Sequence, residues 1–174
     1  MAKVSVMTGN KNCLIWLWLM VFVVAADLFS KQLATEMLEY AIPYPLLPVF
    51  DLTLLHNRGA AFSFLADAGG WQRWFFAVIA MVVSAVLLRW LQKTPRAIWW
   101  LGLALSLVLG GALGNLYDRV VQGYVIDFIS LHYANYYFPA FNLADSAITL
   151  GAIILIVDMI FLEPKRQTSG ENEL

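Results

Sequence analysis

The sequence predicts a mainly α-helical membrane protein with four transmembrane helices and a small β-sheet at the membrane surface. Two observations predict this fold class. Hydrophobic residues make up 61% of the 174 residues and charged residues only 13%, a balance that would leave a water-soluble protein with an apolar exterior. In addition, four segments are apolar over roughly the 20 residues that a helix needs to cross the hydrocarbon. We expect a single membrane domain over residues 1–174.

The first transmembrane helix is expected at about residues 13–30, with Asp27 near its end. Lys3 and Lys11 precede its apolar run, and the small residues 24–26 follow it, so the segment also fits a cleavable signal peptide. We favour an uncleaved span, because a multi-spanning protein can use the same features for its first helix.

The other three helices are expected at about residues 71–90, 97–117 and 141–162. The segment at 97–117 carries no charge, whereas the segment at 141–162 contains Asp145 and Asp158. The remaining residues, 163–174, form a polar tail.

The loop between the first two helices is β-rich at about residues 43–66. Its "PYPLLP" stretch breaks any helix, and "VFDLTLLHNRGAAFSFL" predicts two short strands around a turn at "NRG". The leucine and aromatic content is too high for free solution. We therefore expect a small sheet at the membrane surface, with Phe62 and Phe64 on one face.

The distribution of lysine and arginine predicts that both termini are cytoplasmic. Seven of the 11 basic residues are cytoplasmic in this orientation, and the other four are outside. The long loops, about 31–70 and 118–140, then lie on the outer side. Any extracytoplasmic chemistry should use the outer ends of the helices.

Two carboxylates stand beside apolar runs, where a charge costs at least about 2.5 kcal/mol on insertion scales. Asp127 lies in the β-prone stretch "YVIDFI" without a visible local partner, and Asp145 opens the last helix in "FNLADS". Two carboxylates brought together resist double ionisation, so one keeps a proton while the other acts as a base, as in aspartic proteases. A purely structural alternative is a capping box formed by Asn142 and Asp145.

The other polar groups each have a structural and a functional interpretation. Asp27 and Lys31 are four residues apart and fit an interfacial ion pair in which Lys31 reaches outward. Asn115, Asp118 and Arg119 share a helix face where the third helix leaves the membrane, which fits either a helix cap or a site.

No metal or other cofactor is indicated by the sequence. His56 and His132 lack metal-ligand spacing and are expected to be interfacial or core residues. The single cysteine, Cys13, excludes an intramolecular disulfide and is expected to act as a small apolar residue.

Two other functional classes remain as alternatives. A transporter or proton channel would place polar residues through the full bilayer depth, but the two central helices are almost wholly apolar. A scaffold protein could use the small residues Gly110 and Gly114 to bind another helix, and it should tolerate loss of either aspartate.

The ordered motifs "DLFSK", "HNRGAAFS", "GGALGNLYDR", "YVIDF" and "FNLADS" resemble those of the bacterial lipoprotein signal peptidases, also called signal peptidase II. The resemblance covers most of the chain between Asp27 and Gly151. It implies a multi-pass membrane aspartic endopeptidase that removes signal peptides from diacylglyceryl-modified prolipoproteins, on the N-terminal side of the lipidated cysteine. It also implies an extracytoplasmic β-cradle. Other intramembrane aspartic proteases fit less well, because their GxGD stretch is missing.

The resemblance assigns the catalytic pair to Asp127 and Asp145. It further implies a monomer in contact with membrane lipid in the bacterial inner membrane, an active site near the periplasmic face, inhibition by globomycin-like cyclic peptides, and no nucleic-acid partner. The residues that it places in the substrate pocket or in supporting positions are Asn57, Asn115, Arg119, Asn142, Asp27, Lys31 and Asp118.

Overall fold

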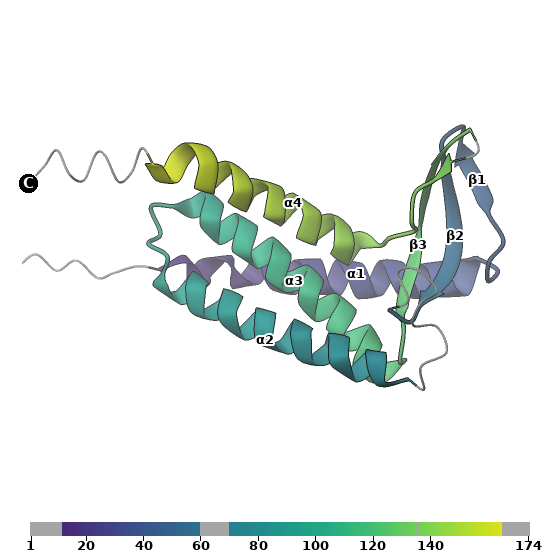
Figure 1. The fold of residues 1–174 in the computed structure, drawn as a ribbon, viewed down its shortest axis with the longest axis horizontal. Helices are drawn as coiled ribbons and strands as arrows, with labels where there is room; N and C mark the ends of the chain where they lie inside the picture. The colour runs from purple at the N-terminus through teal and green to yellow at the C-terminus, as the bar shows by residue number, and fades with distance from the viewer. Residues whose placement is uncertain (1–11, 60–69, 135, 165–174) are drawn as a thin grey trace, which may run out of the picture.

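The computed structural model describes residues 12–59, 70–134 and 136–164, and four of its helices are long and apolar enough to cross a membrane. These helices run side by side, and a small sheet lies across one end of the bundle (Figure 1). The predicted mainly α-helical fold with four membrane helices is therefore confirmed. The helices are α1 (Leu17–Met37), preceded by the 3₁₀ turn η1 (Cys13–Trp16), α2 (Trp71–Lys93), α3 (Trp99–Val121) and α4 (Leu143–Val157), which continues into the π-helical turn η2 (Asp158–Leu162).

Several helix ends differ from the sequence-based boundaries: α2 ends at Lys93 rather than near residue 90, and α3 spans Trp99–Val121 rather than about 97–117. α1 continues to Met37, beyond the predicted end near residue 30, because Lys31 and Ala34 face inward and are buried. Ala34 packs in one apolar cluster with Leu54 of the sheet. α4 begins two residues later than predicted, because residue 142 is the N-cap of that helix.

α3 is the central helix, and α1, α2 and α4 all pack against it. Glycines make the close approaches possible. A Cβ atom at Gly110 would lie 2.8 Å from the Val23 side chain of α1, and one at Gly111 would collide with the backbone carbonyl of Ala144 in α4. The small residues that a scaffold protein would offer to another helix are thus used within this chain.

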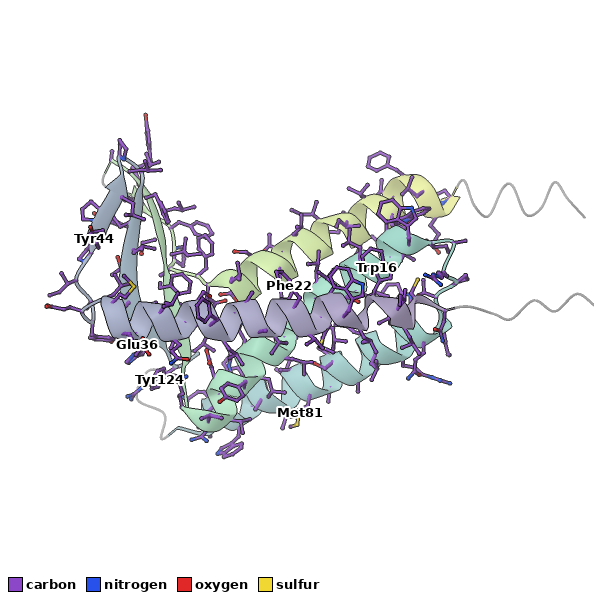
Figure 2. The ribbon with its side chains drawn as sticks, turned by 180° about the vertical axis from the view of Figure 1, so that it is seen from behind. Trp16, Phe22, Glu36, Tyr44, Met81 and Tyr124 are labelled. Atoms are coloured by element: carbon purple, nitrogen blue, oxygen red, sulfur yellow. The ribbon has the colours of Figure 1, made fainter. Side chains whose placement is uncertain are left out.

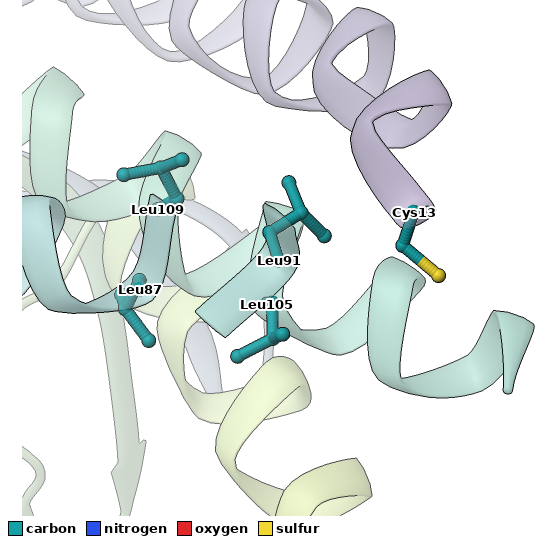
Figure 3. Close-up of a cluster of buried hydrophobic side chains, with 5 residues drawn as sticks. All are labelled: Cys13, Leu87, Leu91, Leu105 and Leu109. Atoms are coloured by element: carbon teal, nitrogen blue, oxygen red, sulfur yellow. The ribbon is translucent and has the colours of Figure 1, made fainter. Parts of the chain in front are cut away.

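The outside of the bundle is apolar, as a lipid-facing surface requires. Phe22 of α1 and Met81 of α2, which are labelled in Figure 2, are 62% and 49% exposed. A buried cluster joins η1, α2 and α3 at the end of the bundle away from the sheet, and Cys13 belongs to it as a small apolar residue (Figure 3). The members of the cluster are Cys13, Leu87, Leu91, Leu105 and Leu109.

The sheet has four antiparallel strands in the order β1-β2-β3-β4, which confirms the predicted small sheet. The strands are β1 (Tyr44–Leu47), β2 (Phe50–Asn57), β3 (Val125–Tyr133) and β4 (Tyr136–Tyr137). β1 falls in "PYPLLP", a part of the predicted β-rich loop in which no strand was predicted, and it makes a hairpin with β2. The second strand predicted after the "NRG" turn, with Phe62 and Phe64, lies outside the described residues.

Candidate active site

Asp127 is held by polar partners from two other elements, where the sheet meets the helix bundle. Its side chain projects from β3 and is only 3% exposed. The Asn57 amide of β2 donates to Asp127 Oδ2 over 3.0 Å, and the Asn142 amide donates to Oδ1 over 2.8 Å. The buried carboxylate that lacked a local partner in the sequence therefore has two partners that are distant along the chain.

Backbone hydrogen bonds bring the start of α4 beside Asp127. The carbonyl oxygen of Phe141 accepts from the N–H groups of Phe128 and Ile129, and the Phe141 N–H donates to the Ile129 carbonyl. Phe141 is thus tied to β3, and the next residue, Asn142, lies next to the carboxylate of Asp127.

Asn142 and Asp145 form the capping box that was considered as a structural alternative. Asn142 Oδ1 accepts from the Asp145 N–H over 2.9 Å, and Asp145 Oδ2 accepts from the Asn142 N–H over 3.3 Å. Both side chains also reach other partners. Asn142 donates to Asp127, and Asp145 Oδ1 accepts from the amide of Asn115 over 2.8 Å. The capping box therefore places Asp145 and Asp127 on either side of one shared asparagine.

The environment of Asp127 disfavours its ionised form. Burial raises the pKa of Asp127 to about 6, and the negative charge of Asp145 adds to this effect. The hydrogen bonds from Asn57 and Asn142 and the positive charge of Lys31 lower the pKa and oppose it. The two carboxylates interact, and Asp127 is the more buried of the pair.

Arg119 supplies a positive charge at the same place. Its guanidinium is half-buried, donates to the backbone carbonyl of Asn115 over 3.2 Å and lies 5.4 Å from the centre of the Phe76 ring. It interacts electrostatically with Asp145, Asp127 and Asp118. A cation is thus available beside the carboxylate pair.

Lys31 was expected to reach outward, but its side chain turns into the helix bundle. The side chain is 1% exposed, and its ammonium group lies 2.7 Å from Asp27 Oδ2 and 2.9 Å from Asp118 Oδ2. The ion pair predicted from the spacing of Asp27 and Lys31 is present. However, Lys31 also pairs with Asp118 of α3, so its ammonium group lies inside the bundle. Asp118 accordingly accepts from Lys31 and from the backbone N–H of Ile126.

An apolar groove opens beside Asp145, between α4 and the outer part of β3. Its volume is about 510 Å³. Its walls include Phe138, Phe141, Leu150 and Ile153, and Asp145 lines one part of it. A long apolar ligand in this groove would contact one member of the carboxylate pair.

Neither histidine belongs to this site. His56 stacks on the Tyr124 ring at 4.0 Å between centroids, and burial lowers its pKa, with the charge of Arg58 acting in the same direction. His132 Nε2 lies 3.3 Å from a carboxylate oxygen of Asp51 in the sheet. Within residues 12–59, 70–134 and 136–164, no three His, Cys, Asp or Glu side chains converge in a way that could hold a metal ion.

Comparison with known proteins decides the family. The model of the family described as Signal peptidase (SPase) II matches residues 19–161. The chain belongs to the signal peptidase II family. This confirms the predicted family and the predicted enzyme class, an aspartic-type signal peptidase in a multi-pass membrane protein.

Similar proteins extend over nearly the whole chain. A protein of Acinetobacter baumannii named lipoprotein signal peptidase is 53% identical over 98% of this chain and 97% of its own length. A protein of the same name from Pseudomonas syringae pv. tomato is 58% identical over 91% of this chain and 90% of its own. A solved structure of a bacterial membrane enzyme, 30% identical, has a TM-score of 0.77 over 88% of this chain and 98% of that one.

Proposed function

We propose that this signal peptidase cleaves diacylglyceryl-modified prolipoproteins on the N-terminal side of the lipidated cysteine, with Asp127 and Asp145 as the catalytic pair. One observation carries this proposal: the two carboxylates flank a single asparagine, Asn142, where the sheet meets the membrane helices. The substrate class is supported by the similar proteins named lipoprotein signal peptidase.

The proton positions follow from the environments of the two acids. Asp127 is the more buried acid and has a raised pKa, so it is assigned the shared proton, and Asp145 is assigned the role of base. Asp145 takes a proton from a water molecule, and the resulting hydroxide attacks the carbonyl carbon of the residue before the lipidated cysteine. Asp127 donates a hydrogen bond to the developing oxyanion. The C–N bond then breaks, and the leaving amine is protonated by the pair.

Asn57, Asn115, Asn142 and Arg119 are assigned to holding the peptide and the pair. The guanidinium of Arg119 has N–H donors that can bind a backbone carbonyl of the substrate. Its positive charge also attracts the carboxylates of Asp127 and Asp145. The amides of Asn57 and Asn142 each orient Asp127, while the amide of Asn115 orients Asp145. These contacts keep the acids fixed while the substrate changes charge.

The groove beside Asp145 fits the lipid of the substrate. Its walls are mainly apolar, and each methylene group buried there contributes about 0.8 kcal/mol. The scissile bond joins the lipidated cysteine to the residue before it, so acyl chains in this groove would bring that bond to Asp145.

We further propose a bacterial inner-membrane location with cytoplasmic termini and an active site near the periplasmic face. The positive-inside pattern of the sequence supports this orientation, because seven of the 11 lysines and arginines precede the first apolar segment, lie around the connection between the second and third segments, or follow the last segment. The enzyme is proposed to act as a monomer among membrane lipids and to bind globomycin-like cyclic peptides at the aspartate pair.

The decisive experiment is cleavage of one prolipoprotein with and without its diacylglyceryl group by the purified protein. We expect efficient cleavage of the lipidated form only, before its cysteine. Equal rates on both forms would contradict the lipid site, and no cleavage of either form would contradict the proposed substrate class.

A further inference from the structure

We propose that Lys31 is a positioning residue that, through Asp27 and Asp118, holds the two catalytic aspartates in place. This inference rests on the proposed function. It concerns the buried charged cluster of Asp27, Lys31 and Asp118, whose acids bind the backbone next to the two catalytic aspartates.

Lys31 has three acceptors for its three N–H donors. The ammonium group lies 2.7 Å from Asp27 Oδ2, 2.9 Å from Asp118 Oδ2 and 2.9 Å from Asn115 Oδ1. These partners come from α1 and α3. A buried charge is stable only when it is paired and hydrogen-bonded, and this cluster meets both conditions.

Each acid of the cluster also holds the backbone just before one catalytic aspartate. Asp27 Oδ1 accepts from the N–H of Ala144 over 2.9 Å, and Ala144 precedes Asp145. Asp118 Oδ2 accepts from the N–H of Ile126 over 3.2 Å, and Ile126 precedes Asp127. Lys31 bridges the two acids, so it links the start of α4 to β3.

Lys31 also fixes the direction of an amide in the active site. Asn115 Oδ1 accepts from the ammonium group over 2.9 Å and from the Asn142 amide over 3.2 Å, so Asn115 Nδ2 points the other way and donates to Asp145 over 2.8 Å. Without the lysine, Asn115 Oδ1 would lose the shorter of its two hydrogen bonds, and the amide would be held less firmly in this direction. An interfacial ion pair of Asp27 and Lys31 alone would have no such effect.

Gly114 provides independent support for the position of Asp27. A Cβ atom at residue 114 would lie 2.5 Å from Asp27 Oδ2, closer than Cβ atoms come to other heavy atoms. The central helix thus lacks a side chain at the place where the carboxylate passes to reach Lys31 and the start of α4.

Lys31 acts on the electrostatics of the pair as well. The charged groups that act on Asp127 are Asp145 of α4, Lys31 of α1 and Arg119 of α3. Burial is the main cause that raises the pKa of Asp127, and Lys31 lowers it. Removing the positive charge therefore raises that pKa, which a purely structural role of Lys31 would not predict.

The test compares Lys31→Met with Lys93→Met, a matched change at an exposed lysine at the end of α2. The assay is cleavage of lipidated prolipoprotein as a function of substrate concentration and pH. We expect Lys31→Met to lower kcat by about 10²-fold with little change in KM, since small displacements of catalytic groups have effects of this size. The fall of kcat/KM at high pH should also move to higher pH. Lys93→Met should match the wild type.

The variant Lys31→Met/Asp118→Asn removes one negative charge together with the positive one and serves if the single variant does not fold. It should melt near the wild-type temperature and show the same loss of kcat and the same pH shift. Wild-type kcat and pH profile in a folded variant would overturn the inference, as would failure of both variants to fold. If the wild type and Lys93→Met do not cleave the substrate, the proposed function itself fails.

Discussion

Replacing Asn142 separates its capping role from its role in the active site. The side chain is fully buried, accepts from the Asp145 N–H over 2.9 Å and donates to Asp127 over 2.8 Å. Asn142→Ser keeps an oxygen that can cap α4 but replaces the amide donor by the hydroxyl of a shorter side chain. Asn142→Ala loses both the cap and the donor.

The typical energies of such contacts give a magnitude for each loss. A helix cap contributes about 0.5–2 kcal/mol, so the alanine variant should be less stable than the serine variant by about 1 kcal/mol, or roughly 2–4 °C in Tm. The donor contacts a carboxylate, and removing one preorganised donor from an active site costs about 10²- to 10³-fold in kcat. Both variants should therefore lose activity by similar factors, although their stabilities differ.

The assay is initial-rate cleavage of lipidated prolipoprotein in detergent, beside helical content and Tm from circular dichroism. A different pattern would refute the reasoning. If Asn142→Ser cleaves like the wild type, and Asn142→Ala loses activity only in proportion to its unfolded fraction, then Asn142 is a helix cap alone.

Three further changes test other parts of the site. Arg119→Ala should lower kcat/KM by about 10²-fold in a folded protein, whereas a protein that loses thermal stability but cleaves normally would show that Arg119 is structural. Activity should fall as pH rises through about 6, because Asp127 must keep its proton. Asn57→Ala should move this fall to higher pH, since the Asn57 hydrogen bond lowers the pKa of Asp127. An unchanged pH profile would argue against this contact. Cleavage should survive excess EDTA, because no metal-ligand set occurs among the described residues; a loss restored by one divalent metal would contradict the aspartate pair.

Much of the fold and site could be predicted because the signals were local. Four apolar segments predicted the membrane helices, and an acid in the β-prone stretch around Asp127 indicated a functional carboxylate before its partners were known. The spacing of Asn142 and Asp145 predicted a capping box, which is present. Its structural and functional interpretations were given as alternatives, but the two side chains cap the helix and also reach other polar groups: Asn142 donates to Asp127, and Asp145 accepts from Asn115.

The rest depended on contacts between segments that are distant in the chain. The spacing of Asp27 and Lys31 identified one partner, whereas the lysine turns inward toward Asp118 and Asn115 on α3. The contacts of the two acids with the N–H groups of Ala144 and Ile126 leave no trace in the sequence, because any residue except proline supplies a backbone donor. The small residues of α3 predicted a helix contact but could not indicate which helices they meet.

Substitution of the two aspartates tests the central claim most directly. Asp127→Asn, Asp145→Asn and the double variant should be purified, shown to fold by Tm and helical content, and assayed on lipidated prolipoprotein. Asparagine keeps the shape of the side chain but cannot exchange a proton with water or with its partner. Each single variant should lose about 10²- to 10⁴-fold in cleavage rate, and the double variant should be scarcely worse, because the two acids act as one unit. Near wild-type cleavage by either single variant would contradict the account, since that aspartate would then not be catalytic.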